Sequence, residues 1–184
     1  DKRGTIPLSD GLSYNEYLEE QLNFKGLSTR KNIIGKYLIG SLDNDGYLRR
    51  ELSSICDDIA FSLGIETTKK ELEEMLCLIQ TFAPYGTGAR NLQEALILQL
   101  KHHPQTTEVK LAIKVLEQYF NDFAKKHFDK IIQRLGIDED TFRKVVDTIK
   151  GLSPKPANQY IETAQSEPTI QIIPDFILEY NNGE

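Results

Sequence analysis

The stretch FAPYGTGARNLQEALILQL (residues 82–100) places a proline, two glycines and an arginine directly before a leucine-rich helical pattern. A glycine loop at a helix N-terminus can bind phosphate, because free N–H groups and the helix dipole converge there. Nucleotide-binding loops need a preceding strand and a GxGxxG or GxxxxGK[ST] spacing, whereas a helical pattern precedes GTG here. The stretch therefore predicts a corner between two helices, in which Pro84 ends one helix and Gly86 and Gly88 reverse the chain.

Arg90 stands close to the start of the helix that follows this corner. A cation at a helix N-terminus opposes the helix dipole by roughly 0.3–1 kcal/mol. We therefore expect its guanidinium to have a carboxylate partner, either within the fold or on another molecule. Asn91 is well placed to cap the helix, and Pro104 ends it.

Apolar residues recur at helical spacing on both sides of the corner. Ser13 with Glu16 and Thr68 with Glu71 match the capping-box pattern, and Gly64 ends the helical pattern before Thr68. The first expected helix begins at residue 14 and stops at Gly26, and the second carries the apolar stripe from Ile33 to Leu42. The later expected helices cover 52–63, 69–82, 92–102, 107–120, 122–134 and 139–151. Short connections between helices favour small antiparallel bundles.

Two segments of the chain repeat one pattern. LGIETTKKELEEMLCLIQTFAPYG (63–86) and LGIDEDTFRKVVDTIKGLSPKP (135–156) both run from Leu-Gly-Ile through a capped helix to a proline-directed exit. Two copies are too few for a solenoid and favour paired subdomains. We expect an all-α fold of two small helical bundles in tandem, over 13–103 and 104–156, after a disordered or extended leader at 1–12.

The composition changes after Pro156. ANQYIETAQSEP (157–168) is polar and predicts a linker, whereas TIQIIPDFILEYNNGE (169–184) is rich in β-branched and aromatic residues and closes with an Asn-Asn-Gly turn signal. A turn implies a second strand, so this segment predicts a truncated β hairpin. Residues 157–184 are interpreted as a linker and the start of a following β or DNA-binding region.

The chain has 184 residues, of which 39% are hydrophobic and 27% charged, as in an ordinary soluble domain. No apolar run approaches the roughly 20 residues of a membrane-spanning helix. The first residues lack the apolar core of a secretion signal, so we expect a cytoplasmic protein without a membrane partner. The chain begins at Asp1 and its one methionine is Met75, which indicates a piece of a longer polypeptide.

The formal net charge of −6 argues against nucleic-acid binding over the whole surface. Residues 123–157 differ from the rest, because they carry eight Lys or Arg against five Asp or Glu. Such a run is most often a solvated helix face, and a basic surface for a partner is the alternative.

SLDNDGYLRREL (residues 41–52) resembles a calcium-binding loop at Asp43, Asp45 and Gly46. A serine occupies its first ligand position and a leucine its twelfth, where the loop needs carboxylates. The stretch therefore predicts a tight helix-to-helix turn in which Gly46 takes a positive φ. It is not expected to bind calcium.

No other pattern carries catalytic or metal chemistry. Cys56 and Cys77 lack metal-ligand spacing, and the three histidines have no further ligands at suitable spacing. Signatures of metalloproteases, nucleophile elbows and phosphate loops are absent from the sequence. We expect no cofactor, no metal, no small-molecule substrate and no enzymatic activity.

Four segments together resemble a known family. SLDNDGYL, IQTFAPYGTGARNLQEALILQL, IKGLSPKPA and IIPDFILEYNNG follow the order found in the core-binding domain of bacterial sigma-54 RNA polymerase sigma factors. The resemblance runs from about Leu12 to the end, although Ala157 stands where the family usually has glycine. It implies a module that docks sigma on core RNA polymerase. For the full factor it implies promoter DNA and an ATP-dependent activator as further partners.

Exposed charges are the expected polymerase contacts, and glycines, prolines and aspartates are the expected turn residues. The contact candidates are Arg49, Arg50, Arg90, Lys125, Lys126 and Arg134, and the turn candidates are Asp43, Asp45, Gly46, Pro84, Gly86, Gly88, Pro154 and Pro156. A free-standing helical regulatory or adaptor module with a different partner is the alternative. An enzyme or nucleotide-binding domain is a formal third possibility.

Overall fold

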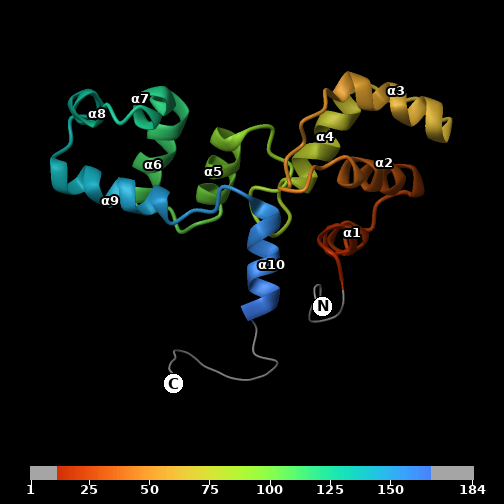
Figure 1. Cartoon of the computed structure of the whole chain (residues 1–184). Helices are drawn as coiled ribbons and strands as arrows, with labels where there is room; N and C mark the ends of the chain where they lie inside the picture. The colour runs from red at the N-terminus through yellow and green to blue at the C-terminus, as the bar shows by residue number, and fades with distance from the viewer. Residues whose placement is uncertain (1–11, 167–184) are drawn as a thin grey trace.

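The computed structural model describes residues 12–166, and within this range every regular element is an α-helix (Figure 1). The helices are α1 (Tyr14–Asn23), α2 (Thr29–Gly40), α3 (Leu52–Leu63), α4 (Lys69–Ile79), α5 (Leu92–Lys101), α6 (Thr107–Gln118), α7 (Phe120–Ala124), α8 (Phe128–Leu135), α9 (Glu139–Lys150) and α10 (Pro156–Ser166). The predicted all-α class is confirmed for the described part of the chain. The expected β hairpin at 169–184 lies outside the described residues.

Side-chain caps begin several of these helices, as the sequence predicted. Ser13 and Glu16 form a full capping box, since the Ser13 N–H donates to Glu16 Oε1 at 2.8 Å and the Glu16 N–H donates to Ser13 Oγ at 3.1 Å. At the start of α4, Thr68 Oγ1 accepts from the Glu71 N–H at 3.1 Å. The Glu71 carboxylate pairs with Arg30 at 2.9 Å, so only half of the second predicted box forms.

The two Leu-Gly-Ile segments adopt the same local structure. Gly64 ends α3 and Gly136 ends α8, each in the left-handed conformation with φ +68°. The next helix is then capped by Thr68 in one copy and by Asp138 in the other, each accepting from the N–H three residues on. Because glycine adopts positive φ without steric cost, these two positions set both helix–turn–helix corners.

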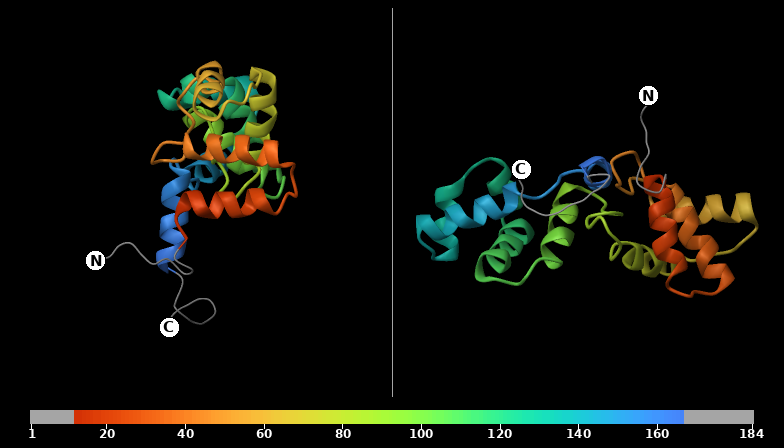
Figure 2. Two further views of the ribbon diagram at one scale, coloured as in Figure 1. Left: turned by 90° about the vertical axis from the view of Figure 1, so that its right-hand side faces the viewer. Right: turned by 90° about the horizontal axis from the view of Figure 1, so that it is seen from below.

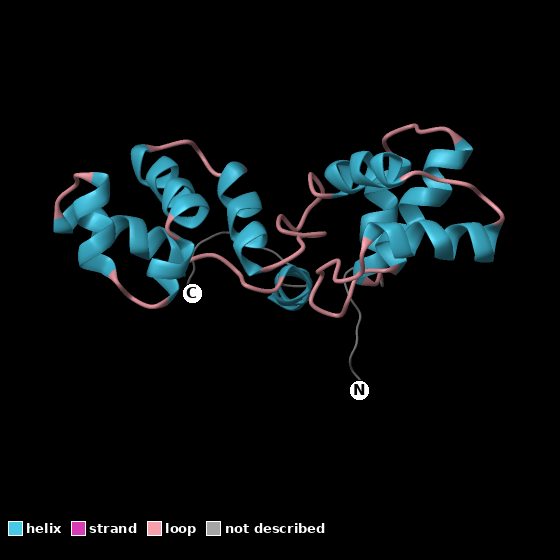
Figure 3. Ribbon diagram, turned by 90° about the horizontal axis from the view of Figure 1, so that it is seen from above, coloured by secondary structure: helices cyan, strands magenta, loops and turns pink. Residues whose placement is uncertain are grey.

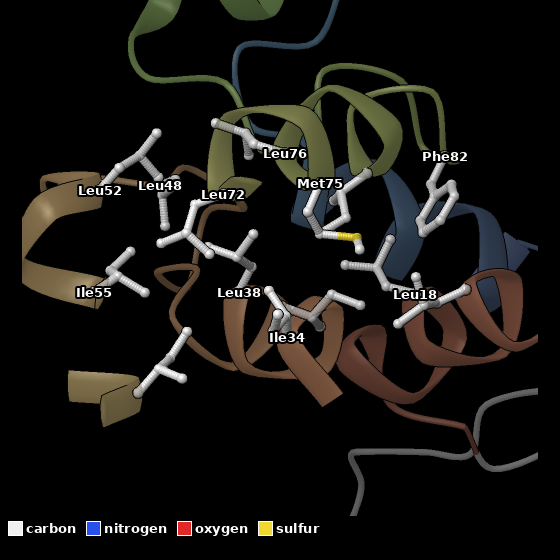
Figure 4. Packing of buried hydrophobic residues seen from close by; sticks show 14 residues of the cluster. Leu18, Ile34, Leu38, Leu48, Leu52, Ile55, Leu72, Met75, Leu76 and Phe82 are labelled. Carbon is white, nitrogen blue, oxygen red and sulfur yellow. The ribbon is translucent and has the colours of Figure 1, made fainter. Parts of the chain in front are cut away.

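Helices α1 to α4, the first helical group, enclose one hydrophobic cluster (Figure 4). Its buried residues are Leu18, Leu22, Ile34, Leu38, Ile39, Leu48, Leu52, Ile55, Ile59, Leu72, Met75, Leu76, Ile79 and Phe82. Gly35 of α2 allows close packing here, because a Cβ at this position would lie 2.7 Å from Leu22 Cδ2 and 3.1 Å from Met75 Sδ. The sequence pattern alone did not identify this role.

Helices α5 to α9, the second helical group, lie around a separate cluster on the other side of α10 (Figures 1 and 3). Its buried residues are Leu96, Leu100, Val109, Ala112, Val115, Leu116, Ile131, Phe142, Val145, Val146 and Ile149. Helix α5 belongs to this cluster through Leu96 and Leu100, whereas the sequence had placed it with the residues before 103. Helix α5 therefore shares a hydrophobic core with α6 and α9.

Two further segments differ from the sequence prediction. The helix expected over 122–134 is broken between α7 and α8, where Lys126 has a positive φ of +65°. The polar segment expected as a linker after Pro156 forms α10. Pro156 opens that helix, a position that proline favours because the first helical N–H needs no partner within the helix.

Candidate functional site

The two glycine turns of the sequence lie side by side between the helical groups. The Gly88 N–H donates to the Gly46 carbonyl at 2.9 Å, and the Leu48 N–H donates to the Ala89 carbonyl at 2.9 Å. A third segment, which leads from α9 into α10, joins them. We call residues 43–50, 82–91 and 151–157 together the loop junction.

The turn at Asp43 is closed by its own carboxylate. Asp43 Oδ1 accepts from the N–H groups of Asp45 and Tyr47, both at 2.9 Å, and Gly46 has φ +98°. The other oxygen, Oδ2, lies 3.3 Å from Arg49 Nε. This carboxylate thus supports a turn, as predicted from the incomplete calcium-loop pattern. Within residues 12–166 no cluster of three His, Cys, Asp or Glu side chains is placed to hold a metal.

Three N–H groups of the corner at 82–91 are bonded to carbonyls of the protein. Gly86 and Gly88 have φ +103° and +82°. The N–H groups of Thr87, Gly88 and Ala89 donate to the carbonyls of Pro84, Gly46 and Gly86 at 3.3, 2.9 and 3.2 Å. A phosphate cradle needs such groups free, so the predicted structural corner is the arrangement that forms.

Arg90 lies half-buried at the end of this corner and binds main-chain oxygens. Its Nε donates to the Leu48 carbonyl and its guanidinium NH2 nitrogen to the Arg50 carbonyl, both at 3.0 Å. Among residues 12–166 the guanidinium therefore binds carbonyl oxygens instead of the carboxylate expected within the fold, and a carboxylate partner on another molecule stays a prediction. Glu94 instead accepts the Arg90 main-chain N–H at 2.6 Å, which places its negative charge at the start of α5, where the helix dipole favours it.

The segment from α9 to α10 closes the loop junction. The Tyr47 hydroxyl donates to the Pro154 carbonyl, and the Ala157 N–H donates to the Asp45 carbonyl at 3.1 Å. Pro156 packs beside Gly86, where a Cβ would lie 3.1 Å from Pro156 Cγ. Six of the eight predicted turn residues thus meet a turn far away in the chain, namely Asp45, Gly46, Gly86, Gly88, Pro154 and Pro156.

Three polar side chains that were not among the predicted site residues hold these loops. Gln99 is 4% exposed; its Nε2 donates to the Ser153 carbonyl at 2.7 Å and its Oε1 accepts the Ser153 N–H at 2.9 Å. Tyr47 is 3% exposed. Tyr14 of α1 reaches the corner, where its hydroxyl hydrogen bonds the Thr87 hydroxyl at 2.7 Å.

Burial changes the chemistry of both tyrosines. It raises the pKa of the Tyr14 hydroxyl from 10.0 to about 12, opposed by the hydrogen bond to Thr87 and assisted by the negative charge of Asp43. The pKa of Tyr47 is also raised, chiefly by burial, and the positive charge of Arg49 opposes this shift. Both groups stay neutral hydrogen-bonding hydroxyls at neutral pH, which suits a structural role.

A family model described as the core-binding domain of sigma-54 factor matches residues 7–184. The chain belongs to this sigma-54 core-binding family. RNA polymerase sigma-54 factor of Pseudomonas aeruginosa (strain UCBPP-PA14) is 34% identical to it over 179 residues, which are 97% of this chain and 35% of the relative. The Pseudomonas putida factor is 36% identical over 175 residues, 95% and 34% of the two chains. The Bacillus subtilis (strain 168) factor is 32% identical over 165 residues, 90% and 35%.

The resemblance inferred from the four sequence segments is thereby confirmed. The chain spans about a third of the length of these sigma-54 relatives. In this sigma-54 core-binding domain, SLDNDGYL, APYGTGAR and LSPKPA meet at the loop junction. The segment IIPDFILEYNNG lies outside the described residues. No helix in residues 12–166 is both long and apolar enough to cross a bilayer.

Three of the six candidate contact residues of this core-binding domain lie together at the loop junction. Arg49 and Arg50 keep 56% and 50% of their side chains exposed while pairing with Asp43 and Asp58, respectively. The Arg49 guanidinium also lies over the Tyr47 ring, 4.3 Å from its centroid. Arg90 holds the main chain of this segment, so it positions the two exposed arginines.

The other three candidates lie in the second helical group. Lys125 and Lys126 stand between α7 and α8, and Arg134 lies near the end of α8; all three are exposed. Among the residues that the structure describes, none of the three forms an ion pair. Neighbouring Lys130, in contrast, lies 3.7 Å from Asp122. The structure therefore separates the candidates into two surfaces.

Proposed function

We propose that this domain binds core RNA polymerase and anchors a sigma-54-type transcription initiation factor on it. The observation that carries the proposal is the match of residues 7–184 to a family described as the core-binding domain of sigma-54 factor. The names of the relatives, RNA polymerase sigma-54 factor, give the same partner. We assign no enzymatic activity to the domain.

The role of the longer protein extends this proposal. Because the chain spans about a third of its relatives, segments beyond it would supply further functions of the factor. In the proposed scheme those segments bind promoter DNA and respond to an ATP-dependent activator. The present domain supplies the attachment to polymerase, in the cytoplasm.

The domain is proposed to consist of two helical bundles in tandem. The separate hydrophobic clusters of α1 to α4 and of α5 to α9 support this division. Because α5 shares the second cluster, the proposed boundary falls within the corner at 82–91 instead of at 103. We also propose that residues 169–184 form a β segment, which begins the next region of the longer protein.

We expect two charged surfaces to contact polymerase. Arg49 and Arg50 form the first, and their position is supported by the bonds from Arg90 to the main chain. Lys125, Lys126 and Arg134 form the second, where exposed cations without ion-pair partners among the described residues are free to bind acidic groups. Charged surfaces of this kind raise the association rate and also contribute to binding affinity.

Gel filtration of the chain with core RNA polymerase tests the function. Co-elution is expected, and full-length sigma-54 factor in excess should displace the chain. A folded chain that elutes separately from polymerase would contradict the proposal and favour a regulatory or adaptor module with another partner.

Charge reversal tests the two surfaces. Arg49→Glu with Arg50→Glu, and Lys125→Glu with Lys126→Glu, should each weaken binding about tenfold or more, because opposed charges become like charges. Matched controls with the same charge change are Lys36→Glu with Lys70→Glu and Lys110→Glu with Lys114→Glu, at exposed positions of each group. If contact and control variants bind equally well, the proposed surfaces are wrong even though polymerase binding stands.

A further inference from the structure

The last described helix, α10, follows the second helical group in the chain but packs on the first. The Tyr160 ring stacks on Tyr17 of α1 with centroids 5.0 Å apart and planes at 28°, and its centroid lies 6.0 Å from that of Tyr14. The Tyr160 hydroxyl donates to the Leu12 carbonyl at 2.8 Å. Figure 2 shows α10 beside the start of α1. We call Leu12, Tyr14, Tyr17 and Tyr160 the tyrosine clasp.

The amino-terminal end of α10 is held by a different set of contacts. The Ala157 N–H donates to the Asp45 carbonyl at 3.1 Å, and Ala157 is 3% exposed. Pro156 lies against Gly86 and Gly46 of the loop junction. A helix held only at this end could pivot, whereas a second attachment along its length sets its direction. The tyrosine clasp is that second attachment.

We propose that α10 is a strap whose tyrosine clasp fixes the direction in which the chain leaves the two helical groups. The clasp also holds α10 beside Leu12, the residue just before the cap of α1. Ring contacts and a single hydrogen bond of this kind are modest interactions, so the clasp can open while the loop junction stays closed. Opening would let α10 turn about Ala157 and change the reach of the region that follows.

Distances between spin labels test this strap without polymerase, in the whole chain. Cys77 is exposed on α4, and Glu162→Cys adds a label on α10 in a Cys56→Ser background. We expect a narrow distance distribution for this pair in the chain with Tyr160 intact. Tyr160→Ala should broaden it by about twofold or more, because an unclasped helix samples several orientations. Tyr160→Phe keeps the stack and should stay close to the original width.

Two controls separate the clasp from general loosening. Ile161→Ala changes the next residue, which is 43% exposed, and should leave the distribution unchanged. A label pair at Cys77 and Lys144→Cys spans the two helical groups and should keep its distribution in Tyr160→Ala.

An unchanged distribution for the Cys77–Glu162 pair in Tyr160→Ala would overturn the proposal. Equal broadening of both label pairs would overturn it as well, because the clasp would then hold the whole domain and not α10. If circular dichroism shows that Tyr160→Ala loses helix, Tyr17→Ala removes the stacking partner from α1 and is judged by the same criteria.

Discussion

The main-chain N–H of Gly88 donates to the carbonyl of Gly46 at 2.9 Å, and the two glycines have φ +82° and +98°. This hydrogen bond therefore joins two turns from separate parts of the chain. Their surroundings differ, since a Cβ would lie 2.7 Å from Tyr14 Oη at position 46 and 3.3 Å from Leu76 Cδ1 at position 88. Gly46 is the less tolerant of a side chain.

Gly46→Ala should lower the free energy of unfolding by about 2–3 kcal/mol, because it combines positive-φ strain with a steric clash. Gly64→Ala should cost about 1 kcal/mol, since Gly64 also has positive φ but nothing lies within 4 Å of its Cβ position. Gly40→Ala, in open space within α2, should be neutral or slightly stabilising. Urea unfolding measures all three. If Gly46→Ala and Gly64→Ala lower the free energy of unfolding equally, the contact with Tyr14 adds no steric cost.

Arg90→Lys should destabilise the chain by about 1–3 kcal/mol. A lysine ammonium cannot reproduce the planar fork that bonds the carbonyls of Leu48 and Arg50 together. The matched control is Arg143→Lys, whose side chain is 69% exposed and pairs with Asp140, and its effect should stay within about 0.5 kcal/mol. If urea melts give the same small change for both variants, Arg90 does not hold the loop junction.

Local signals in the sequence predicted much of the helical framework. Ser13 and Gly64 act within a few residues of their own position, so capping and left-handed turns can be recognised from nearby residues. The corner at 82–91 was predicted for the same reason. The partner of Arg90 could not be predicted, because its carbonyl acceptors lie in a loop that only the tertiary fold brings close.

Helix α10 was also missed, because contacts that only the tertiary fold creates support it. Its residues are mostly polar, which favoured a linker, and its helical state is supported by contacts with distant segments, through Ala157 and Tyr160. Tertiary packing commonly overrides local preference in this way. The break at Lys126 was missed because positive φ at a residue with a side chain has no clear sequence signal.

Gln99→Met should cost about 1–3 kcal/mol of unfolding free energy. Methionine has similar volume, so the change removes the paired hydrogen bonds to the Ser153 N–H and carbonyl, together with the bond to the Ala95 carbonyl, while it largely keeps the packing. Gln118→Met, at an exposed position in α6, is the control and should change stability little. The melts should be followed by circular dichroism. Comparable stability of the two variants would show that water replaces Gln99 at no cost.

The raised pKa of Tyr14 predicts a loss of stability at alkaline pH. Because folding raises this pKa from 10.0 to about 12, the folded chain holds the proton more tightly than the unfolded chain. The stabilisation is fully present below pH 10 and is lost as the pH rises toward 12. Tyr14→Phe should therefore reduce the alkaline loss by about 2–3 kcal/mol, while costing about 1 kcal/mol at neutral pH through the lost hydrogen bond to Thr87.

Thr87→Val separates the titration of Tyr14 from its hydrogen bond. Thr87 is fully buried and its hydroxyl lowers the pKa of Tyr14, so this variant keeps the titrating group and should keep or steepen the alkaline loss. Unfolding free energies measured from about pH 8 to about pH 12 compare both variants with the original chain. An equal alkaline loss in Tyr14→Phe and the original chain would assign the effect to other groups, among them Tyr47, whose pKa is also raised by burial.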